Sequence, residues 1–396
     1  MTNSPPGNVN HGLGPNEAGR PLVSGIDSLS LAFDLSWLSS ETFDRLEALK
    51  EKSKDQDTAV FQVEGGDVVW EFVVKPHGSN GYAWLIQNRE MSMKIGAWTE
   101  PRQRPSAMVD VRSEALWTHG PAVAVNRVVR TLAGMGAVVR HIKPSRLDLC
   151  VDVLIREKDW TLDLINSFVT RARNIGPHLQ SRDLSGFSIG SGKVHARIYD
   201  KPMEIRSKSK KSWMFDIWRL PEVPEKHRVV RVEFQLRREA LRDFSLNAWR
   251  EVPAKLDGLW AYCSRQWLRI VDDARLHHTQ QTVLPWWTVV QGGFRKAQGA
   301  TPLVRNKAVQ ADRERLSAQL VGLASSMVAL SNALPDDLLP ECLDRRSFCQ
   351  GTLDDALAVS GMNDGRFTQR VASKRAKYGR GPEGGSEEAT SLPPPE

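Results

Sequence analysis

Cysteine and tyrosine are scarce in this sequence, and closely spaced metal-binding pairs are missing. The 396 residues include four tyrosines and four cysteines, and the cysteines Cys150, Cys263, Cys342 and Cys349 show no C-x-x-C spacing. This spacing argues against a structural zinc site, and so few cysteines fit a reducing cytoplasm. No His-apolar-His element occurs either. From the cysteine spacing we therefore expect no structural zinc site.

Long apolar runs are also missing. The most apolar helix-like run, residues 319–334, is too short and too polar to cross a bilayer. The first 20 residues are polar and rich in Pro, Gly and Asn, which does not fit a signal peptide. We expect a soluble, cytoplasmic protein that makes no contact with a membrane.

What the chain does have is length, positive charge and tryptophan. Its size allows one large or two ordinary domains with a substantial core. The net charge of +7 and the pI near 9.3 permit a polyanionic partner without proving one. The 13 tryptophans could stack on unpaired nucleic-acid bases, or could simply pack in the core.

Three segments alternate between apolar and polar residues, which predicts β-strands with one polar face. They span residues 145–156, 193–206 and 229–239. If they pair, the polar face gathers one tyrosine among carboxylates and cations: Asp148, Asp152, Arg197, Tyr199, Lys201, Glu204, Arg231 and Glu233. The simpler alternative is three ordinary half-buried strands with solvated outer faces.

Such a face suits attack by a tyrosine on a phosphodiester. The reference pKa of tyrosine is about 10, so Arg197, Lys201 or a nearby metal ion would be needed to favour the phenolate. Cations also stabilise the negative charge of the pentavalent transition state. Asp148 and Glu233 offer hard oxygen ligands for Mg²⁺ or Mn²⁺.

The remaining polar residues of this face are given secondary roles. Asp152 is kept in reserve as a metal ligand, because two residues four apart on a strand are about 13 Å apart. Arg231 is expected to hold the phosphate together with Arg197 and Lys201. Glu204 is expected to position Lys201 or a water molecule.

The order of the motifs adds a resemblance to a known family. The strings R-x-D-x-x-x-D from Arg146, R-I-Y-D-K-x-x-E from Arg197 and R-V-E-F-x-L-R from Arg231 resemble those of the replication initiation factor family. This family comprises trans-acting initiators of rolling-circle replication and related relaxases of phages, plasmids and integrative elements. The resemblance is good over residues 140–240 and weaker over 22–135 and 255–295.

The resemblance implies an activity and places residues in it. In the family, the tyrosine of the second motif nicks one strand at an origin and stays bound to the 5′ phosphate; Tyr199 stands at that position. The acidic residues of the first and third motifs correspond to Asp148 and Glu233. The partners implied are origin DNA, duplex and single-stranded, with a host helicase and a second copy of the chain as further candidates.

Two rival functions remain open. A relaxase that starts conjugative transfer would use the same chemistry, and a DNA-binding regulator could keep the fold without cutting. The His-apolar-His element of the other large class of nicking enzymes is absent from the sequence.

The predicted fold class is α+β. We expect an antiparallel sheet, possibly built from two similar halves, with helices on one face. Gly-Ile-Asp at 25–27 echoes Arg-Leu-Asp at 146–148, which is the basis for the two halves. Residues 119–136 and 159–174 have helical periodicity. The phosphate-loop-like GFSIGSGK at 186–193 has the wrong spacing, and we interpret it as a hairpin turn.

The predicted organisation has four parts. Residues 1–21 are expected to be disordered, 22–300 to form the nicking domain, 301–380 a helical extension with a basic end at 365–380, and 381–396 a disordered tail. The insert 205–228, with its KSKK run and aromatic residues, is either a long hairpin loop or an arm that grips DNA.

Overall fold

The computed structural model describes residues 9–10, 21–55, 59–65, 68–294 and 303. All of these belong to one compact unit, Met1–Asn306. The predicted extension over 301–380, apart from residue 303, and the predicted tail lie outside the described residues. The same holds for most of the predicted disordered segment 1–21, within which Val9–Asn10 forms a short strand, β1, paired with β2.

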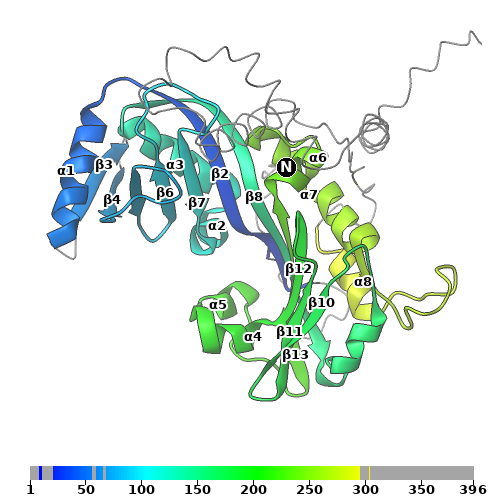
Figure 1. The fold of residues 1–396 in the computed structure, drawn as a ribbon. Helices are drawn as coiled ribbons and strands as arrows, with labels where there is room; N and C mark the ends of the chain where they lie inside the picture. Colours follow the sequence, from blue (N-terminus) through cyan, green and yellow to red (C-terminus); the bar gives the residue numbers. More distant parts are fainter. Residues whose placement is uncertain (1–8, 11–20, 56–58, 66–67, 295–302, 304–396) are drawn as a thin grey trace, which may run out of the picture. The chain divides into compact units, whose positions relative to one another are not determined.

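A large antiparallel sheet dominates the fold and confirms the α+β class (Figure 1). Among the described residues, eleven of its twelve strands follow the order β10-β11-β12-β13-β8-β2-β7-β6-β5-β4-β3, and β1 pairs with β2 outside this path. The two central strands are also the longest, β2 (Val23–Trp37) and β8 (Ala137–Arg156). They pair with each other along most of their length. The idea of two duplicated halves stays a prediction.

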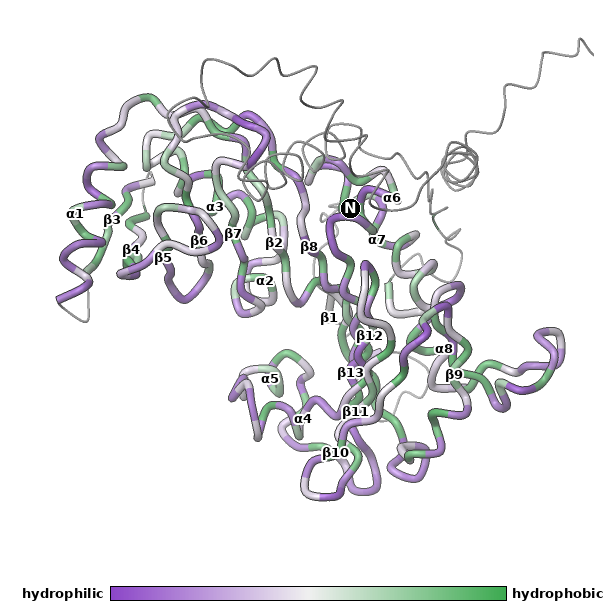
Figure 2. The backbone as a smooth tube through the Cα atoms, in the orientation of Figure 1, coloured by the Kyte–Doolittle hydropathy of each residue, from purple (hydrophilic) through white to green (hydrophobic). Residues whose placement is uncertain are grey.

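A meander and three helices occupy the side of the sheet beyond β2. The strands are β3 (Ala59–Gly65), β4 (Val68–Val74), β5 (Trp84–Gln87), β6 (Met91–Ile95) and β7 (Ala107–Val111). The helices are α1 (Glu41–Asp55), α2 (Ser113–His119) and α3 (Pro121–Gly134). Figure 2 shows hydrophilic and hydrophobic residues interleaved along α1, which contacts β3, β4 and β5. The helix predicted from the periodicity of residues 119–136 is confirmed, because α3 lies within this range.

The other side of the sheet carries the three strands predicted from their alternation. Beyond β8 come β13 (His227–Arg237), β12 (Val194–Asp200), β11 (Asp183–Ile189) and β10 (Ile175–Gln180). The predicted strands therefore pair in the order β12-β13-β8. Gly190, with a positive φ of 76°, begins the turn from β11 to β12. The interpretation of 186–193 as a hairpin turn is right for 190–193, whereas 186–189 belong to β11.

One face of the sheet packs against most of the helices. The apolar set of β8, which includes Leu147, Leu149 and Val151, belongs to the same core as Trp260 and Val290. Those two residues come from α7 (Val252–Ala261) and α8 (Pro285–Gln291), and α6 (Arg238–Asp243) contacts β8 as well. Burial of large apolar side chains is the main source of stability here. Short helical turns fill this region: η1 (Glu157–Asp159), η2 (Leu162–Ser167), η4 (Trp249–Glu251) and η5 (Tyr262–Trp267).

A second, smaller helical layer covers part of the opposite face, where the sequence placed no helix. The insert 205–228 is not a plain loop, and its role as an arm that grips DNA stays a prediction. Within 201–228 the chain forms α4 (Lys201–Glu204), η3 (Ile205–Ser209) and α5 (Met214–Trp218). Met214 and Trp218 pack with Trp117 of α2 and Cys150 of β8 in a separate apolar cluster. The insert therefore buries one end of the polar face.

One predicted helix is wrong. Residues 159–174 form the 3-10 helix η2 and then the strand β9 (Phe168–Thr170). β9 pairs with β14 (Leu268–Ile270) in a small second sheet. The pairing satisfies backbone groups that a helix would have used internally, and the β-branched Val169 and Thr170 favour it.

None of the helices in the described ranges has the length and hydropathy needed to cross a bilayer.

Candidate functional site

The register of β12, β13 and β8 decides which polar residues are neighbours. Tyr199 lies opposite Arg231, which lies opposite Asp152. In the next row toward the other end of the strands, Arg197 lies opposite Glu233. Residues directly opposite each other in an antiparallel sheet point to the same face. All five side chains therefore share one face, as the alternation predicted.

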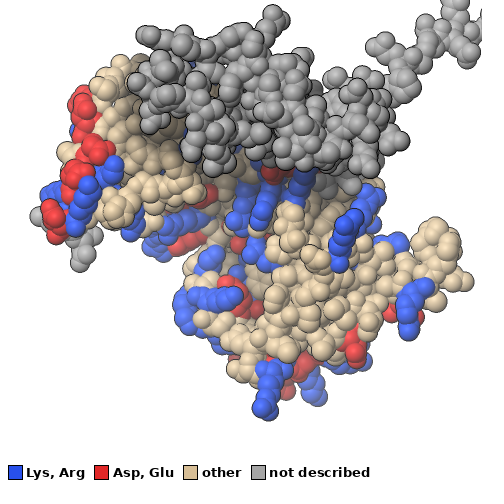
Figure 3. All heavy atoms as spheres, in the orientation of Figure 1, with Lys and Arg blue, Asp and Glu red and all other residues tan. Residues whose placement is uncertain are grey.

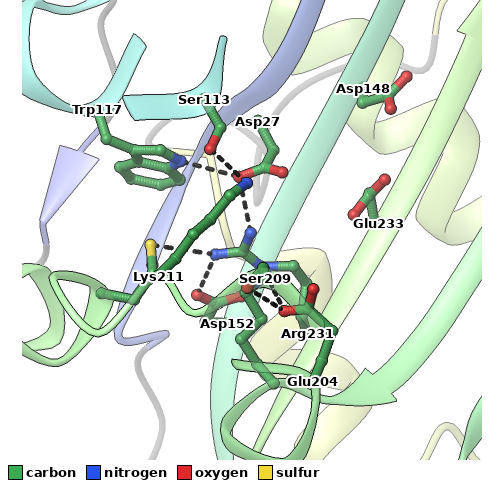
Figure 4. A network of polar contacts seen from close by, with 12 residues as sticks. Asp27, Ser113, Trp117, Asp148, Asp152, Glu204, Ser209, Lys211, Arg231 and Glu233 are labelled. Carbon is green, nitrogen blue, oxygen red and sulfur yellow. Dashed lines mark hydrogen bonds and ion pairs between the residues drawn. The ribbon is translucent and has the colours of Figure 1, made fainter. Parts of the chain in front are cut away.

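Asp148 and Glu233 form a carboxylate pair held by arginines. A terminal nitrogen of Arg197 lies 2.6 Å from Glu233 Oε1 and 3.5 Å from Asp148 Oδ2. Arg146 donates from Nε to Asp148 Oδ1 at 2.8 Å and forms a second, shorter bond to Oδ2. Figure 4 shows Asp148 and Glu233 close together on neighbouring strands. The sequence predicted this proximity.

Tyr199 is hydrogen-bonded to Glu233, one member of the carboxylate pair. Its hydroxyl donates to Glu233 Oε2 at 3.0 Å, so Glu233 bridges Arg197 and Tyr199 through its two oxygens. Burial, together with the negative charge of Glu233, raises the pKa of Tyr199 well above its usual value. The phenol is therefore protonated in this state, and Glu233 is the group placed to accept its proton.

Asp148 has an unusual electrostatic environment. Burial and the charge of Glu233 raise the pKa of Asp148 to about 7, against the opposing pull of Arg146 and Arg197. Perturbed carboxylates of this kind gather at functional sites more often than elsewhere. The side chain is fully buried under these contacts.

Arg231 and Asp152 belong to a second, separate network. The Arg231 guanidinium is fully buried and donates to both oxygens of Asp152, at 2.6 and 2.7 Å, and to Asp27 at 2.7 Å. Trp218 donates to Asp152 at 2.7 Å and Trp117 to Asp27 at 3.0 Å. Figure 4 shows this group apart from Asp148 and Glu233.

This network changes the roles expected of two residues. Arg231 was expected to contact the phosphate and Asp152 was the reserve metal ligand. With these bonds made, the two side chains bind each other beneath the insert, and neither is available to a substrate in this conformation. Asp27 was not among the predicted site residues. Its only sequence signal was the Gly-Ile-Asp echo at 25–27.

Lys201 and Glu204 lie where β12 ends and α4 begins. Asp200 starts that helix by accepting a hydrogen bond from the backbone of Met203 at 2.7 Å. Lys201 is 2% exposed, and its ammonium lies 2.7 Å from Glu204 and 5.5 Å from the centre of the Tyr199 ring. Burial, with help from the charge of Arg231, lowers the pKa of Lys201. The predicted pairing of Glu204 with Lys201 is therefore present in the structure.

A pocket of about 470 Å³ opens beside Tyr199. Tyr199 and Arg197 line it from β12, and Glu204 lines it from α4. Gly186 lies opposite Tyr199 on β11. A Cβ at that position would lie 2.7 Å from the Cβ of Tyr199 and 2.6 Å from the carbonyl oxygen of Ile198. Only glycine fits there without a shift, so Gly186 sets how closely β11 approaches the tyrosine.

The carboxylate pair fits a divalent cation in part. Two carboxylates and the Gln235 amide oxygen, 3.4 Å from the same Arg197 nitrogen, converge on one point. Such oxygens suit Mg²⁺ or Mn²⁺. No cluster of three or more His, Cys, Asp or Glu side chains suited to a metal occurs among the described residues. An ion here would have to compete with Arg197 and take further ligands from water or substrate.

No protein-family model matches the chain, and the search of curated proteins found no match.

Proposed function

We propose that the protein nicks and rejoins one strand of DNA, with Tyr199 as the nucleophile. The observation that carries the proposal is the 3.0 Å hydrogen bond from the Tyr199 hydroxyl to Glu233, beside Arg197 and at the wall of a pocket. A nucleophile bonded to a base that a third group orients is the usual arrangement for covalent catalysis.

The chemistry follows from the positions of these groups. The Tyr199 oxygen attacks the phosphorus of a phosphodiester as its proton passes to Glu233 Oε2. The bond from phosphorus to the 3′ oxygen breaks, leaving the 5′ phosphate attached to the tyrosine and a 3′ hydroxyl once the leaving oxygen is protonated by solvent. Attack by that hydroxyl reverses the steps and rejoins the strand.

Arg197 is the cation best placed to stabilise the phosphate. Its side chain is 37% exposed, lines the pocket and lies next to Glu233, the carboxylate bonded to Tyr199. A guanidinium donor directed at a non-bridging oxygen stabilises the charge that develops in the transition state. Lys201 supplies a second positive charge near the ring of Tyr199. Glu204 positions Lys201.

Asp148 and Glu233 would hold the divalent cation, Mg²⁺ or Mn²⁺, that the proposal includes. When bound, the ion supplies positive charge close to the reacting phosphate.

The basic surface supports nucleic acid as the substrate. Figure 3 shows Lys and Arg side chains gathered on the surface over β8 and β12. Such a surface attracts a phosphate backbone without choosing a sequence. We propose a role as initiator of rolling-circle replication, acting on origin DNA in the cytoplasm, with a helicase and a second copy of the chain as proposed partners. The relaxase role shares the same chemistry, and the neighbouring genes would distinguish the two.

Two observations favour the non-catalytic alternative. Asp148 and Glu233 are already paired with arginines, and the pKa of Tyr199 is raised. A DNA-binding regulator with this fold would need neither a metal bound by these carboxylates nor an ionised Tyr199.

The test is incubation with a supercoiled plasmid that carries the replication origin of the plasmid, phage or integrative element that encodes the protein. The result separates an enzyme from a regulator. An enzyme should convert the plasmid to a nicked, protein-linked form only when Mg²⁺ or Mn²⁺ is added. A regulator should shift the plasmid in a gel and leave it intact.

A further inference from the structure

The pocket beside Tyr199 extends away from the carboxylate pair, toward the edge of the sheet. Its floor comes from β10, β11 and β12, and its side wall from α4 and η3. At about 470 Å³ it falls within the range of about 300–1,000 Å³ typical of small-ligand sites. The roles proposed above for Tyr199 and Arg197 use only one wall of this space.

Register explains why the floor is open. His178 lies opposite Gly186, which lies opposite Tyr199. Because Gly186 has no side chain, nothing from β11 stands between His178 and Tyr199 on this face. In the next row Ser188 lies opposite Arg197, and its hydroxyl is 2.7 Å from His178 Nε2. The row of His178, Gly186 and Tyr199 and the row of Ser188 and Arg197 together form a polar floor for the pocket. Tyr199 lies at its inner end.

The lining separates into neutral and charged parts. Uncharged donors and acceptors come from Gln180, Ser185 and Ser188 on the strands at the edge, and the His178 ring lies beside them. The cation Arg197 lies beside the tyrosine, and Lys208 lies on the helical wall.

The two carboxylates that line the pocket are already paired. Asp200 accepts from Arg228 at 2.9 Å, and Glu204 accepts from Lys201 and Ser209. Met203 adds an apolar contact to the same wall. A neutral polar end and a cationic inner end match a nucleotide, whose base is uncharged and whose phosphate is an anion.

We infer that this pocket receives one unpaired nucleotide of the DNA strand, the one that adjoins the phosphate attacked by Tyr199. The phosphate faces Arg197 and the base lies toward His178, Gln180 and Ser188. A base held in such a pocket has left its pairing partner, so the DNA at this position is single-stranded when it is cut. The inference rests on the proposed function and adds the pocket, and its residues, that would receive the nucleotide next to the cut.

The test uses the full chain carrying Tyr199→Phe, so that binding is measured without cleavage. The probe is a fluorescent single strand of about twelve thymidylates, a length typical of single-strand sites. Adding His178→Ala, or separately Gln180→Ala, should weaken binding in fluorescence anisotropy by about fivefold or more, the size of effect seen when a base loses its contacts. Leu179→Ala is the matched control, because Leu179 is exposed on the same strand and does not line the pocket.

A second measurement locates the base directly. The same strand carrying one photoreactive 4-thiothymidine should cross-link, on irradiation, to peptides containing His178, Ser188 or Met203. Circular dichroism melting of each variant shows that it is folded, and Gln180→Ala alone decides the result if His178→Ala unfolds.

The outcomes distinguish the two proposals. Tight binding with unchanged affinity in both pocket variants and cross-links only elsewhere would overturn the pocket assignment and leave nicking by Tyr199 intact. Absence of nicking in the plasmid assay, together with cross-links in the pocket, would contradict the proposed enzymatic activity. It would still support a pocket that binds single-stranded DNA. No binding of the strand at all would overturn the pocket assignment.

Discussion

The hydroxyl of Tyr199 and the carboxylate of Glu233 meet diagonally across β12 and β13, at 3.0 Å. Directly opposite residues in this register are Tyr199 with Arg231 and Arg197 with Glu233. The diagonal contact works because both side chains are long enough to span the larger separation. It links the proposed nucleophile to the carboxylate that also holds Arg197.

Replacement of the carboxylate pair tests the proposed base role of Glu233 and the proposed metal-binding role of both residues. Asp148→Asn and Glu233→Gln keep the shape of each side chain and remove its charge. We expect nicking to fall by about 10²-fold or more in each variant, the usual loss when one charge-stabilising group is removed. Binding to origin DNA should survive, because neither residue contributes positive charge. Nicking by both variants at the wild-type rate with limiting Mg²⁺ would show that the assignment is wrong.

Gly186→Ala tests whether the approach of β11 positions the tyrosine. The added methyl group would meet Tyr199 Cβ at 2.7 Å, so the two strands must shift apart locally. A displacement of about 1 Å at a reacting group can cost about 10²-fold in rate. We therefore expect nicking to fall by about that factor, measured under single-turnover conditions.

Gly176→Ala is the matched control for this change. Gly176 lies in the neighbouring strand β10, and a Cβ there would meet nothing within 4 Å. The control should nick normally. Equal activity in the two variants would mean that Tyr199 does not depend on Gly186.

Asp27→Asn tests the buried network under the insert. Burial alone would raise the pKa of Asp27, but the charges of Arg231, Lys201 and Lys211 and the Trp117 hydrogen bond hold it well below its usual value. A carboxyl with a lowered folded-state pKa stabilises the fold above its unfolded pKa of about 4, and that contribution is lost as the pH falls below this value. The variant should lose about 2 kcal/mol at neutral pH.

Urea unfolding at several pH values checks this prediction. The stability gap between wild type and Asp27→Asn should narrow as the pH falls from about 5 toward 3. Asp159→Asn, which removes an exposed partner of Arg156, should cost less than about 1 kcal/mol at neutral pH. A gap for Asp27→Asn that stays constant with pH would contradict the account.

The sequence predicted the sheet and part of the site, and the reason lies in periodicity. Alternation in the three segments placed Asp148, Arg197, Tyr199 and Glu233 on one face, and β12, β13 and β8 do pair. Local pattern carries this information, because side chains on a strand alternate between two faces.

What covers the face could not be predicted in the same way. Arg231 follows the same alternation as Glu233, yet its partner Asp27 is 204 residues away in the chain. Its burial depends on an insert that is anchored to the sheet by distant contacts such as that of Trp218 with Asp152. The pocket was missed for a related reason, since His178 and Gly186 join the site only through the register of β10 and β11.

The most direct test of the central claim is the identity of the residue that becomes attached to DNA. A labelled DNA strand from the origin of the plasmid, phage or integrative element that encodes the protein is incubated with Mg²⁺ and the wild-type protein, Tyr199→Phe or Tyr262→Phe. Tyr262→Phe is the control, because it changes a buried tyrosine of η5 instead. The adduct of the wild-type protein is then digested and its DNA-bearing peptide sequenced. We predict that the 5′ phosphate is on the peptide containing residues 198–201, that Tyr199→Phe forms no adduct, and that a folded Tyr262→Phe still does. An adduct on another tyrosine, or undiminished adduct with Tyr199→Phe, would contradict the account.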